Sequence, residues 1–470
     1  MAVEWSGSGP ELMVALDRDR PLRAQVEDQL RAAIRNGRLA ADEKLPSTRS
    51  LAATLGLSRG LVQECYEQLV AEGYLTARTG SATRVAAMST NRERQEPAAP
   101  PAARVSAPPP LVADFPSGVP DLAMAPREDW AWAVREACRT APNVAFDYDD
   151  PRGVLRTREV VAAYLRRVRA MDVAASQVVV CSGFAQGLAV VLRALARVGL
   201  TRVACEDPGS IGTVTAAAEA AGGSAVPVPV DEHGIDVAAL RASGARVAVL
   251  TPAHQWPTGV VLGPERRHDL LAWAREVDGV VVEDDYDAEF RYDRDPVGSL
   301  QGLDPDRVVT LGTVSKSLAP ALRLGWAVVP AAIVEEVVGE KQVADRGSSG
   351  IDQLALAALV ASGRYDRHLR KMRTEYSRRR DVLVDALTTY APAVRVSGLA
   401  AGFHAVAHLP GHANEADVLE QALARGVGLR GMSTYRSTGS ATPPQLVLGF
   451  GNTSTRAIEA GIRTVADLLQ

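Results

Sequence analysis

The sequence has little cysteine and no surplus of either charge, and these two shortages exclude whole classes of protein. Only four cysteines occur in 470 residues, at positions 65, 138, 181 and 205, and no two of them form a CxxC pair. A disulfide scaffold and a zinc ribbon are therefore disfavoured, and a reducing cytoplasm fits. Lys and Arg number 52 against 56 Asp and Glu, a net charge of −4. This balance excludes a wholly basic nucleic-acid binder but permits a small DNA-binding domain on a near-neutral body.

Long apolar runs are also missing. No uncharged apolar stretch reaches the length of a membrane span, and the N-terminal residues MAVEWSGSGPELM lack the basic and apolar regions of a signal peptide. We therefore expect a cytoplasmic protein that does not associate with membranes. At about 100–200 residues per domain, the length predicts two to four domains.

A proline-rich segment divides the chain. Residues 86–113 contain six prolines and eight alanines. Proline removes a backbone donor and favours extended polyproline geometry, so this segment predicts a semi-rigid tether. We predict an N-terminal domain over residues 12–85, a linker over 86–113 and a large domain over 114–470.

The N-terminal segment has the layout of a winged helix-turn-helix. Apolar residues at positions 22, 26, 30 and 34 recur every four residues and predict a helix that Gly37 ends. Pro46-Ser47 begins a second helix, and Ser58 caps a third. Two extended runs, 73–78 and 82–85, predict a hairpin. The third helix of such a fold can enter the major groove. A small helical interaction domain is the alternative, and charge does not decide between them.

Motifs in this segment favour DNA binding. P-L-R-A-Q-V, K-L-P-S-T-R-S-L-A, L-G-L-S-R and E-G-Y-L follow one another between residues 21 and 75. With these motifs the segment resembles the GntR-type winged-helix domain. The resemblance implies DNA contacts from the second helix, the third helix and the wing, namely Arg49, Ser58, Arg59, Gln63, Thr79, Gly80 and Ser81. Gly60 departs from the family, which usually has a hydroxyl residue there.

The large segment alternates apolar runs with amphipathic stretches. The runs 178–181, 202–206, 246–250, 279–283 and 307–312 are candidate strands with helical stretches between several of them. Runs that are apolar on both faces predict a mostly parallel α/β sheet covered by helices on both sides. Residues 380–470 predict a smaller α+β subdomain.

Chemistry-bearing residues follow several of these runs. A glycine turn at Ser182-Gly183 opens a helix, carboxylates and Tyr286 follow the run 279–283, and Lys316 stands among hydroxyl residues after the run 307–312. Each feature alone also fits an ordinary turn, a solvated loop or a surface charge. In this order, however, residues 114–470 resemble a fold-type I pyridoxal-phosphate (PLP) enzyme of the aspartate-aminotransferase type.

The resemblance implies a role for each of these residues. Lys316 would form the Schiff base with PLP, Asp284 would pair with the pyridinium nitrogen, and Tyr286 would hydrogen-bond the ring phenolate. The phosphate would be held by Arg323, Thr313, Ser315, the backbone of Gly183, Phe184 and Ala185, and Tyr148 of a second subunit in a homodimer. Two positions depart from the family. Trp256 replaces the asparagine that contacts the phenolate, a role that His254 or Gln255 could assume, and Ser210 replaces a ring-stacking aromatic.

The whole chain, with T-P-A-H-Q-W-P-T-G and V-E-D-D-Y-D-A-E-F-R-Y among its motifs, resembles the MocR subfamily of GntR-type regulators. The resemblance implies a PLP-dependent transcription factor whose binding to double-stranded operator DNA responds to an amino compound or to PLP itself. A working aminotransferase that also binds DNA, and a DNA-binding protein with an inactive fold, are the alternatives. Arg430 and Arg436 lie where an effector carboxylate could bind.

Three histidines are spaced by four residues, as metal ligands on a helix would be: His404, His408 and His412. The surrounding sequence alternates like a strand and breaks at Pro410-Gly411. We therefore predict no metal site.

Overall fold

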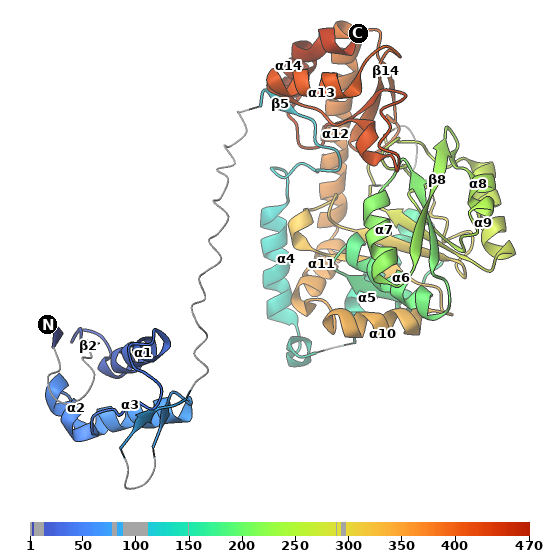
Figure 1. Ribbon diagram of the computed structural model, residues 1–470. Coiled ribbons are helices and arrows are strands. Elements are labelled where there is room, and N and C mark those ends of the chain that lie inside the picture. The colour runs from blue at the N-terminus through green and yellow to red at the C-terminus, as the bar shows by residue number, and fades with distance from the viewer. Residues whose placement is uncertain are drawn as a thin grey trace. The chain divides into compact units, whose positions relative to one another are not determined.

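The computed structural model describes residues 2–3, 14–77, 82–87, 111–148, 150–287, 289–292 and 298–470. The chain forms two compact units, Met1–Ala107 and Pro108–Gln470 (Figure 1). The predicted wing contacts Thr79, Gly80 and Ser81, and most of the predicted linker, lie outside the described residues. No helix in the described ranges combines the length and apolarity needed to cross a membrane.

The first unit contains the predicted three helices and hairpin. Helices α1 (Leu22–Arg35), α2 (Thr48–Leu55) and α3 (Arg59–Ala71) enclose an apolar core with strands β3 (Leu75–Thr76) and β4 (Arg84–Val85), while β1 (Ala2–Val3) pairs with β2 (Val14–Ala15). The predicted cap at Ser58 is confirmed, because its side chain accepts from Leu61 N, and Ser47 caps α2 in the same way by accepting from Ser50 N. Gly56 ends α2 in the left-handed conformation, with φ +65°, which permits the tight turn into α3. The hairpin strands are shorter than predicted.

The second unit is built on an eight-stranded sheet in the order β6-β13-β12-β11-β10-β7-β8-β9. The central pairs are parallel, and β13 and β9 run antiparallel to their neighbours, so the prediction of a mostly parallel sheet is confirmed. The strands are β6 (Val178–Cys181), β7 (Arg202–Asp207), β8 (Ser224–Asp231), β9 (Gly234–Ile235), β10 (Val247–Leu250), β11 (Val280–Asp285), β12 (Val308–Thr313) and β13 (Gly325–Val328).

Three of these strands, β8, β9 and β13, were not predicted from the sequence. Pro227 and Pro229 argue against a strand over 224–231 because proline cannot donate to a sheet ladder. The structure tolerates them because β8 lies near the edge of the sheet, where only the two-residue strand β9 pairs with its far side.

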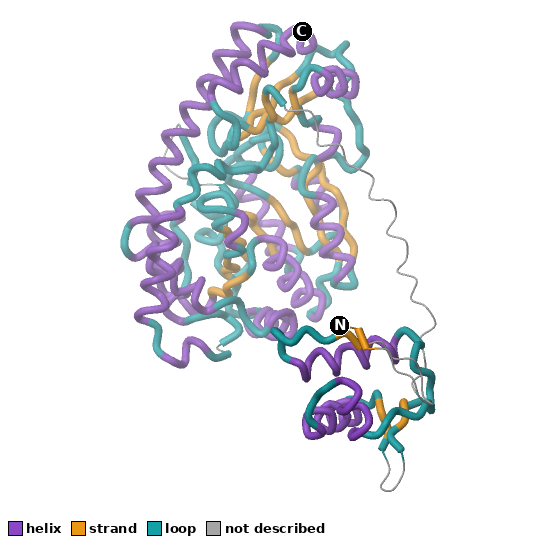
Figure 2. Tube along the Cα trace, turned by 90° about the vertical axis from the view of Figure 1, so that its left-hand side faces the viewer, coloured by secondary structure: helices purple, strands orange, loops and turns teal. Residues whose placement is uncertain are grey.

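Helices cover both faces of this sheet, as Figures 1 and 2 show. Alternate residues of β10 divide between the two layers: Val249 packs with helices α6, α7 and α10, and Ala248 packs with α8 and α9. Over β6 and β13, the second face is covered by α5 and α11. The helices are α4 (Arg127–Thr140), α5 (Leu155–Arg169), α6 (Phe184–Arg197), α7 (Ile211–Ala220), α8 (Val237–Ala242), α9 (Pro264–Glu276), α10 (Val334–Asp345) and α11 (Gly350–Ala361).

The C-terminal part forms the predicted smaller α+β subdomain. The long helix α12 (Arg364–Tyr390) starts well before the predicted residue 380 and leads from the large sheet into this subdomain (Figure 2). A three-stranded antiparallel sheet is made by β14 (Arg395–Ser397), β15 (His404–His408) and β17 (Gln445–Gly449), and β16 (Val427–Gly428) pairs with β5 (Ala113–Asp114). Helices α13 (Glu415–Ala424) and α14 (Thr455–Val465) complete it.

Candidate functional site

A cavity of about 380 Å³ opens where the parallel strands of the large sheet end. Because the carboxyl ends of β6, β7, β10, β11 and β12 lie at one edge, the segments that follow them converge there, as in other open α/β sheets. The cavity is lined by Ser117, Gly118, Phe184, Ala185, Ser210, Thr213, Trp256, Asp284, Tyr286, Thr313, Ser315, Lys316 and Arg323. The structure thus brings together most of the residues that the sequence assigned to a cofactor.

Lys316 follows β12 and reaches into this cavity. Its Nζ donates a hydrogen bond to the carbonyl oxygen of Gly118, at 2.6 Å. Burial lowers the pKa of Lys316, and the carboxylates of Asp284 and Asp287 act in the opposite direction. A lysine with a lowered pKa has a larger neutral fraction and is a better nucleophile than an exposed one.

Asp284, at the end of β11, has a buried carboxylate oxygen that lacks a hydrogen-bond donor among the described residues. Its Oδ1 is shielded from solvent and has no hydrogen-bond partner among the described residues. Burial, followed by the charge of Asp285, raises the pKa of Asp284 well above its ordinary value. An unpartnered buried acceptor is costly unless a ligand supplies the missing donor. A protonated ring nitrogen is such a donor, so this side chain fits PLP.

The other end of the cavity is suited to an anion. Gly183 precedes helix α6 with φ +92° and ψ −173°, a region that only glycine adopts readily. A Cβ at this position would lie 3.6 Å from both Arg323 Nη2 and Thr313 Oγ1. Thr313 Oγ1 donates to Ser315 Oγ at 2.8 Å. Helix amides, hydroxyls and a guanidinium therefore converge on one point, as phosphate binding requires.

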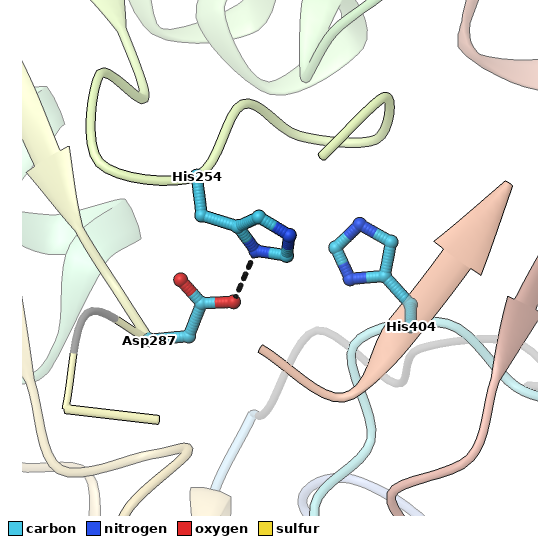
Figure 3. Close-up of side chains that lie close together, drawn as sticks. All are labelled: His254, Asp287 and His404. Atoms are coloured by element: carbon cyan, nitrogen blue, oxygen red, sulfur yellow. Dashed lines mark hydrogen bonds and ion pairs between the residues drawn. The ribbon is translucent and has the colours of Figure 1, made fainter. Parts of the chain in front are cut away.

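Three buried side chains, His254, Asp287 and His404, lie close together (Figure 3), and the ring centre of His404 is 4.9 Å from that of Trp256. His254 Nδ1 and Asp287 Oδ2 are 2.8 Å apart, and the imidazole of His404 on β15 lies with its ring centre 4.7 Å from that of His254. Candidate ligand atoms of these three residues all lie within 4.8 Å of one another. His408 points elsewhere and bonds Ser397 and Gln445. The predicted strand over His404 and His408 is confirmed as β15, and the absence of a metal site stays a prediction.

Neither residue expected to replace the missing asparagine lines the cavity. His254 is bonded to Asp287, and Gln255 Nε2 donates to Pro208 O at 2.9 Å. Trp256 lines the cavity instead, and a contact from His254 or Gln255 to the phenolate stays a prediction. Tyr286 OH donates to the carbonyl oxygen of His254, at 3.0 Å, which fixes the phenol beside the cavity.

Three predicted ligand-binding residues lie outside the cavity of this chain. Tyr148 is 75% exposed and lies against Arg346, whose Cζ is 4.6 Å from the ring centre. Arg430 Nη2 is 3.2 Å from Asp114 Oδ1. The guanidinium of Arg436 donates to Ser440 O at 2.7 Å and to Pro443 O at 3.1 Å.

The sequence did not identify Ser117, Gly118, Thr213 and Trp256 as lining residues. Gly118 contributes a backbone oxygen, and the segment from which it comes lies far from Lys316 in the chain. Of these four residues, only Trp256 stood out in the sequence, because it replaces the asparagine of the family motif.

In the first unit, the predicted DNA-contacting side chains are exposed at the starts of α2 and α3: Arg49, Ser58, Arg59 and Gln63. Two other arginines of this unit are neutralised by carboxylates. Arg23 pairs with Glu27 and Glu64, and Arg31 pairs with Glu72. Arg49 and Arg59 form no ion pair with any residue that the structure describes, so their charges remain available to an anionic partner.

Comparison with known proteins agrees with this architecture. Residues 22–85 match the family model "Bacterial regulatory proteins, gntR family", and residues 113–440 match "Aminotransferase class I and II". The chain is 32% identical to the HTH-type pyridoxine biosynthesis transcriptional regulator PdxR of Corynebacterium glutamicum, over 94% of this chain and 95% of that protein. It is 34% identical to the probable rhizopine catabolism regulatory protein MocR of Rhizobium meliloti, over 96% and 95%.

Solved aminotransferases share the fold of the second unit. Kynurenine aminotransferase of Pyrococcus horikoshii matches with a TM-score of 0.69 and 26% identity, over 76% of this chain and 90% of that chain. An archaeal alanine:glyoxylate aminotransferase matches with a TM-score of 0.68 and 25% identity, over the same shares.

Proposed function

Because this chain belongs to the MocR subfamily of GntR-type transcriptional regulators, we propose that PLP in the cavity of its second unit, together with an amino compound, controls how its winged helix binds operator DNA. The observation that carries this proposal is the cavity itself, which is lined by Lys316, by Asp284 and, at its anion-binding end, by Phe184 and Ala185. The Oδ1 of Asp284 has no hydrogen-bond partner among the described residues.

The residues present fit PLP. Arg323, Thr313, Ser315 and the first amides of α6 would hold the phosphate, and Asp284 would accept from the ring nitrogen. Tyr286 would donate its hydroxyl to the ring phenolate in place of the His254 carbonyl oxygen that it contacts here, and Lys316 would attach to the aldehyde. When bound there, PLP supplies an aldehyde that reacts reversibly with amines and a ring that withdraws electrons. The enclosing residues orient such an amine and limit the access of water.

The attachment site has a direct test. Borohydride reduction of the PLP-loaded protein should fix a pyridoxyl group on the peptide that contains Lys316. The Lys316→Ala variant should take no label under the same conditions. A label on another lysine in the native protein would contradict the proposal.

The DNA-binding part of the proposal rests on two unpaired arginines. Arg59 opens the helix that would enter the major groove, and Arg49 opens the helix that would cross the phosphate backbone. Operator binding by the full chain, measured by fluorescence anisotropy with and without amine, should depend on the amine only when PLP is bound. If operator affinity changed with neither PLP nor the amine, DNA recognition would stand but the regulatory role would be excluded.

We further propose a homodimer in which Tyr148 serves the partner's cavity. The segment between α4 and α5 exposes three large side chains, Val144, Phe146 and Tyr148, and the first residue of α5 adds a fourth, Leu155. Such a group of exposed apolar side chains is typical of an interface. Analytical ultracentrifugation should show a dimer. The Tyr148→Phe variant should bind PLP more weakly but remain a dimer. A monomer at micromolar concentration would contradict this part.

Residual aminotransferase activity is the second candidate function. The lowered pKa of Lys316 and the retained Asp284 favour it, whereas the loss of the asparagine at Trp256 argues against efficient turnover. Keto-acid formation beyond one equivalent per subunit would establish it.

A further inference from the structure

A network of polar side chains lies behind the phosphate end of the cavity. Its first member is Lys341 of α10, which does not line the cavity and whose side chain is fully buried. The Lys341 Nζ lies 2.6 Å and 2.7 Å from the two carboxylate oxygens of Asp345, one helical turn further on, and donates to Ser348 Oγ at 3.0 Å. The buried ammonium is therefore paired with a carboxylate.

Stability alone does not explain a buried ammonium. Removing a charge from water is costly, and replacing a buried ion pair with apolar residues of similar volume is often neutral or stabilising. A role in fixing a neighbouring group accounts for the pair better, and Asp345 has such a neighbour.

Asp345 connects the ion pair to helix α6. Gln186 Nε2 donates to Asp345 Oδ2 at 2.7 Å, across 159 positions of the chain. Burial opposes ionisation of this carboxyl, but hydrogen bonds from Lys341, Gln186 and Gly347 N outweigh burial and lower its pKa. Asp345 is thus an ionised acceptor at neutral pH, and hydrogen bonds to a charged acceptor are stronger than neutral ones.

The oxygen of the Gln186 side chain holds the turn that begins α6. Its Oε1 accepts from Ser182 N at 2.8 Å, and the carbonyl oxygen of Ser182 accepts from Arg323 Nη2 at 2.6 Å. Both peptide groups that flank Ser182 are therefore bonded to side chains. Ser182 directly precedes Gly183, and the two residues after Gly183 line the cavity.

A helix cap explains only part of this arrangement. Glutamine at the third helical position commonly bonds a backbone amide at the start of the helix, and such a cap needs no acid on another helix. The bond to Asp345 adds an orientation, because Nε2 faces the carboxylate and Oε1 then faces Ser182 N. Since an ionised carboxylate only accepts hydrogen bonds, the Gln186 amide cannot turn over without losing both bonds.

We propose that Gln186, oriented by the Lys341–Asp345 ion pair, is a positioning residue for the phosphate of PLP. It holds the peptide groups of Ser182 so that the first amides of α6 and the guanidinium of Arg323 meet the same phosphate group. This inference rests on the proposed function, which places the phosphate at this turn.

PLP and pyridoxal test this proposal, because they differ only in the phosphate. Both would be titrated into the full-length protein and followed by visible absorbance, and inorganic phosphate would be titrated in competition with PLP. Gln186→Leu removes both hydrogen bonds at similar side-chain volume. It should raise the dissociation constants of PLP and of phosphate about 5- to 10-fold, the effect of losing about one hydrogen bond, and leave that of pyridoxal within twofold.

Two results with this variant would overturn the proposal. If PLP and pyridoxal lost affinity equally, Gln186 would act as a helix cap that stabilises the whole cavity. If PLP and phosphate kept their native affinities, the turn would not need this side chain at all.

A second variant keeps the proposal testable if Gln186→Leu does not fold. The double variant Lys341→Met/Asp345→Leu replaces the whole ion pair, so that no charge is left buried without a partner. It frees the Gln186 amide to turn over and should also weaken PLP but not pyridoxal. Adding Gln186→Leu to it should cause no further loss, because the pair acts through that side chain, and fully additive losses would contradict the proposal.

Glu335→Gln is the matched control on the same helix. Glu335 lies in the first turn of α10 and forms an exposed ion pair with Arg152, so its loss should change the affinity of neither ligand. The failure of this inference is distinguishable from that of the proposed function. A native protein that bound neither PLP nor pyridoxal would refute the proposed function, whereas native PLP binding that the Gln186 and ion-pair variants left unchanged would refute only the positioning role.

Discussion

Replacing Gly183 with alanine tests the phosphate end of the cavity most directly. The backbone at this residue has φ +92° and ψ −173°, where a residue with a Cβ costs about 1–3 kcal/mol. We expect this cost to appear as a lower unfolding temperature of the PLP-free protein.

The same methyl group should also weaken PLP binding. It would lie 3.6 Å from Arg323 Nη2 and from Thr313 Oγ1, in the space where phosphate oxygens must approach both donors. Loss of one charge-assisted hydrogen bond is worth about 1.5–3 kcal/mol, so the dissociation constant for PLP should rise about 10- to 100-fold. Absorbance titration of the purified full-length protein with PLP measures it.

Gly212→Ala is the matched control. Gly212 lies in the first turn of α7, between the lining residues Ser210 and Thr213, and a Cβ there would meet nothing within 4 Å. This variant should bind PLP normally and gain up to about 1 kcal/mol of helix stability. If Gly183→Ala lowered the unfolding temperature but kept PLP affinity within threefold of the native value, the phosphate would not bind at this turn.

Three further predictions concern DNA, pH and metal. Arg59→Ala should cost about 1–3 kcal/mol of operator affinity and relax specificity at one base pair, whereas Arg49→Ala should weaken all sequences alike; unchanged affinity in the double variant would discard the winged-helix interface. Burial raises the pKa of Glu206 to about 7, so the folded state retains a proton that the unfolded state has lost between about pH 4.5 and 7. The free energy of unfolding of the wild type should therefore fall with rising pH over this range, relative to that of Glu206→Gln, by roughly 3 kcal/mol in total. Urea unfolding at a series of pH values measures it, and the same pH dependence in both proteins would refute the raised pKa of Glu206. Dialysis against EDTA should leave the unfolding temperature unchanged, because His254 Nδ1 already bonds Asp287; one equivalent of zinc or iron per chain in mass spectrometry of the purified protein would contradict this.

Features determined by neighbouring residues were predictable from the sequence alone. The caps at Ser47 and Ser58 and the turn at Gly56 depend on contacts within four residues. The buried strands β6, β7, β10, β11 and β12 stand out as apolar runs because both of their faces are covered. Since parallel strands share one edge, the residues at the ends of these runs come together, and Phe184, Asp284 and Lys316 do line one cavity.

Only the tertiary structure decided which distant side chains complete the site and which do not. Gly118 accepts from Lys316 across almost 200 positions of the chain, and His404 reaches His254 and Asp287 from the small subdomain. Such contacts depend on how the subdomains pack, about which local periodicity carries no information. For the same reason, the sequence could not show that the guanidinium groups of Arg430 and Arg436 contact Asp114 and the segment around Pro443, or that Trp256 lines the cavity.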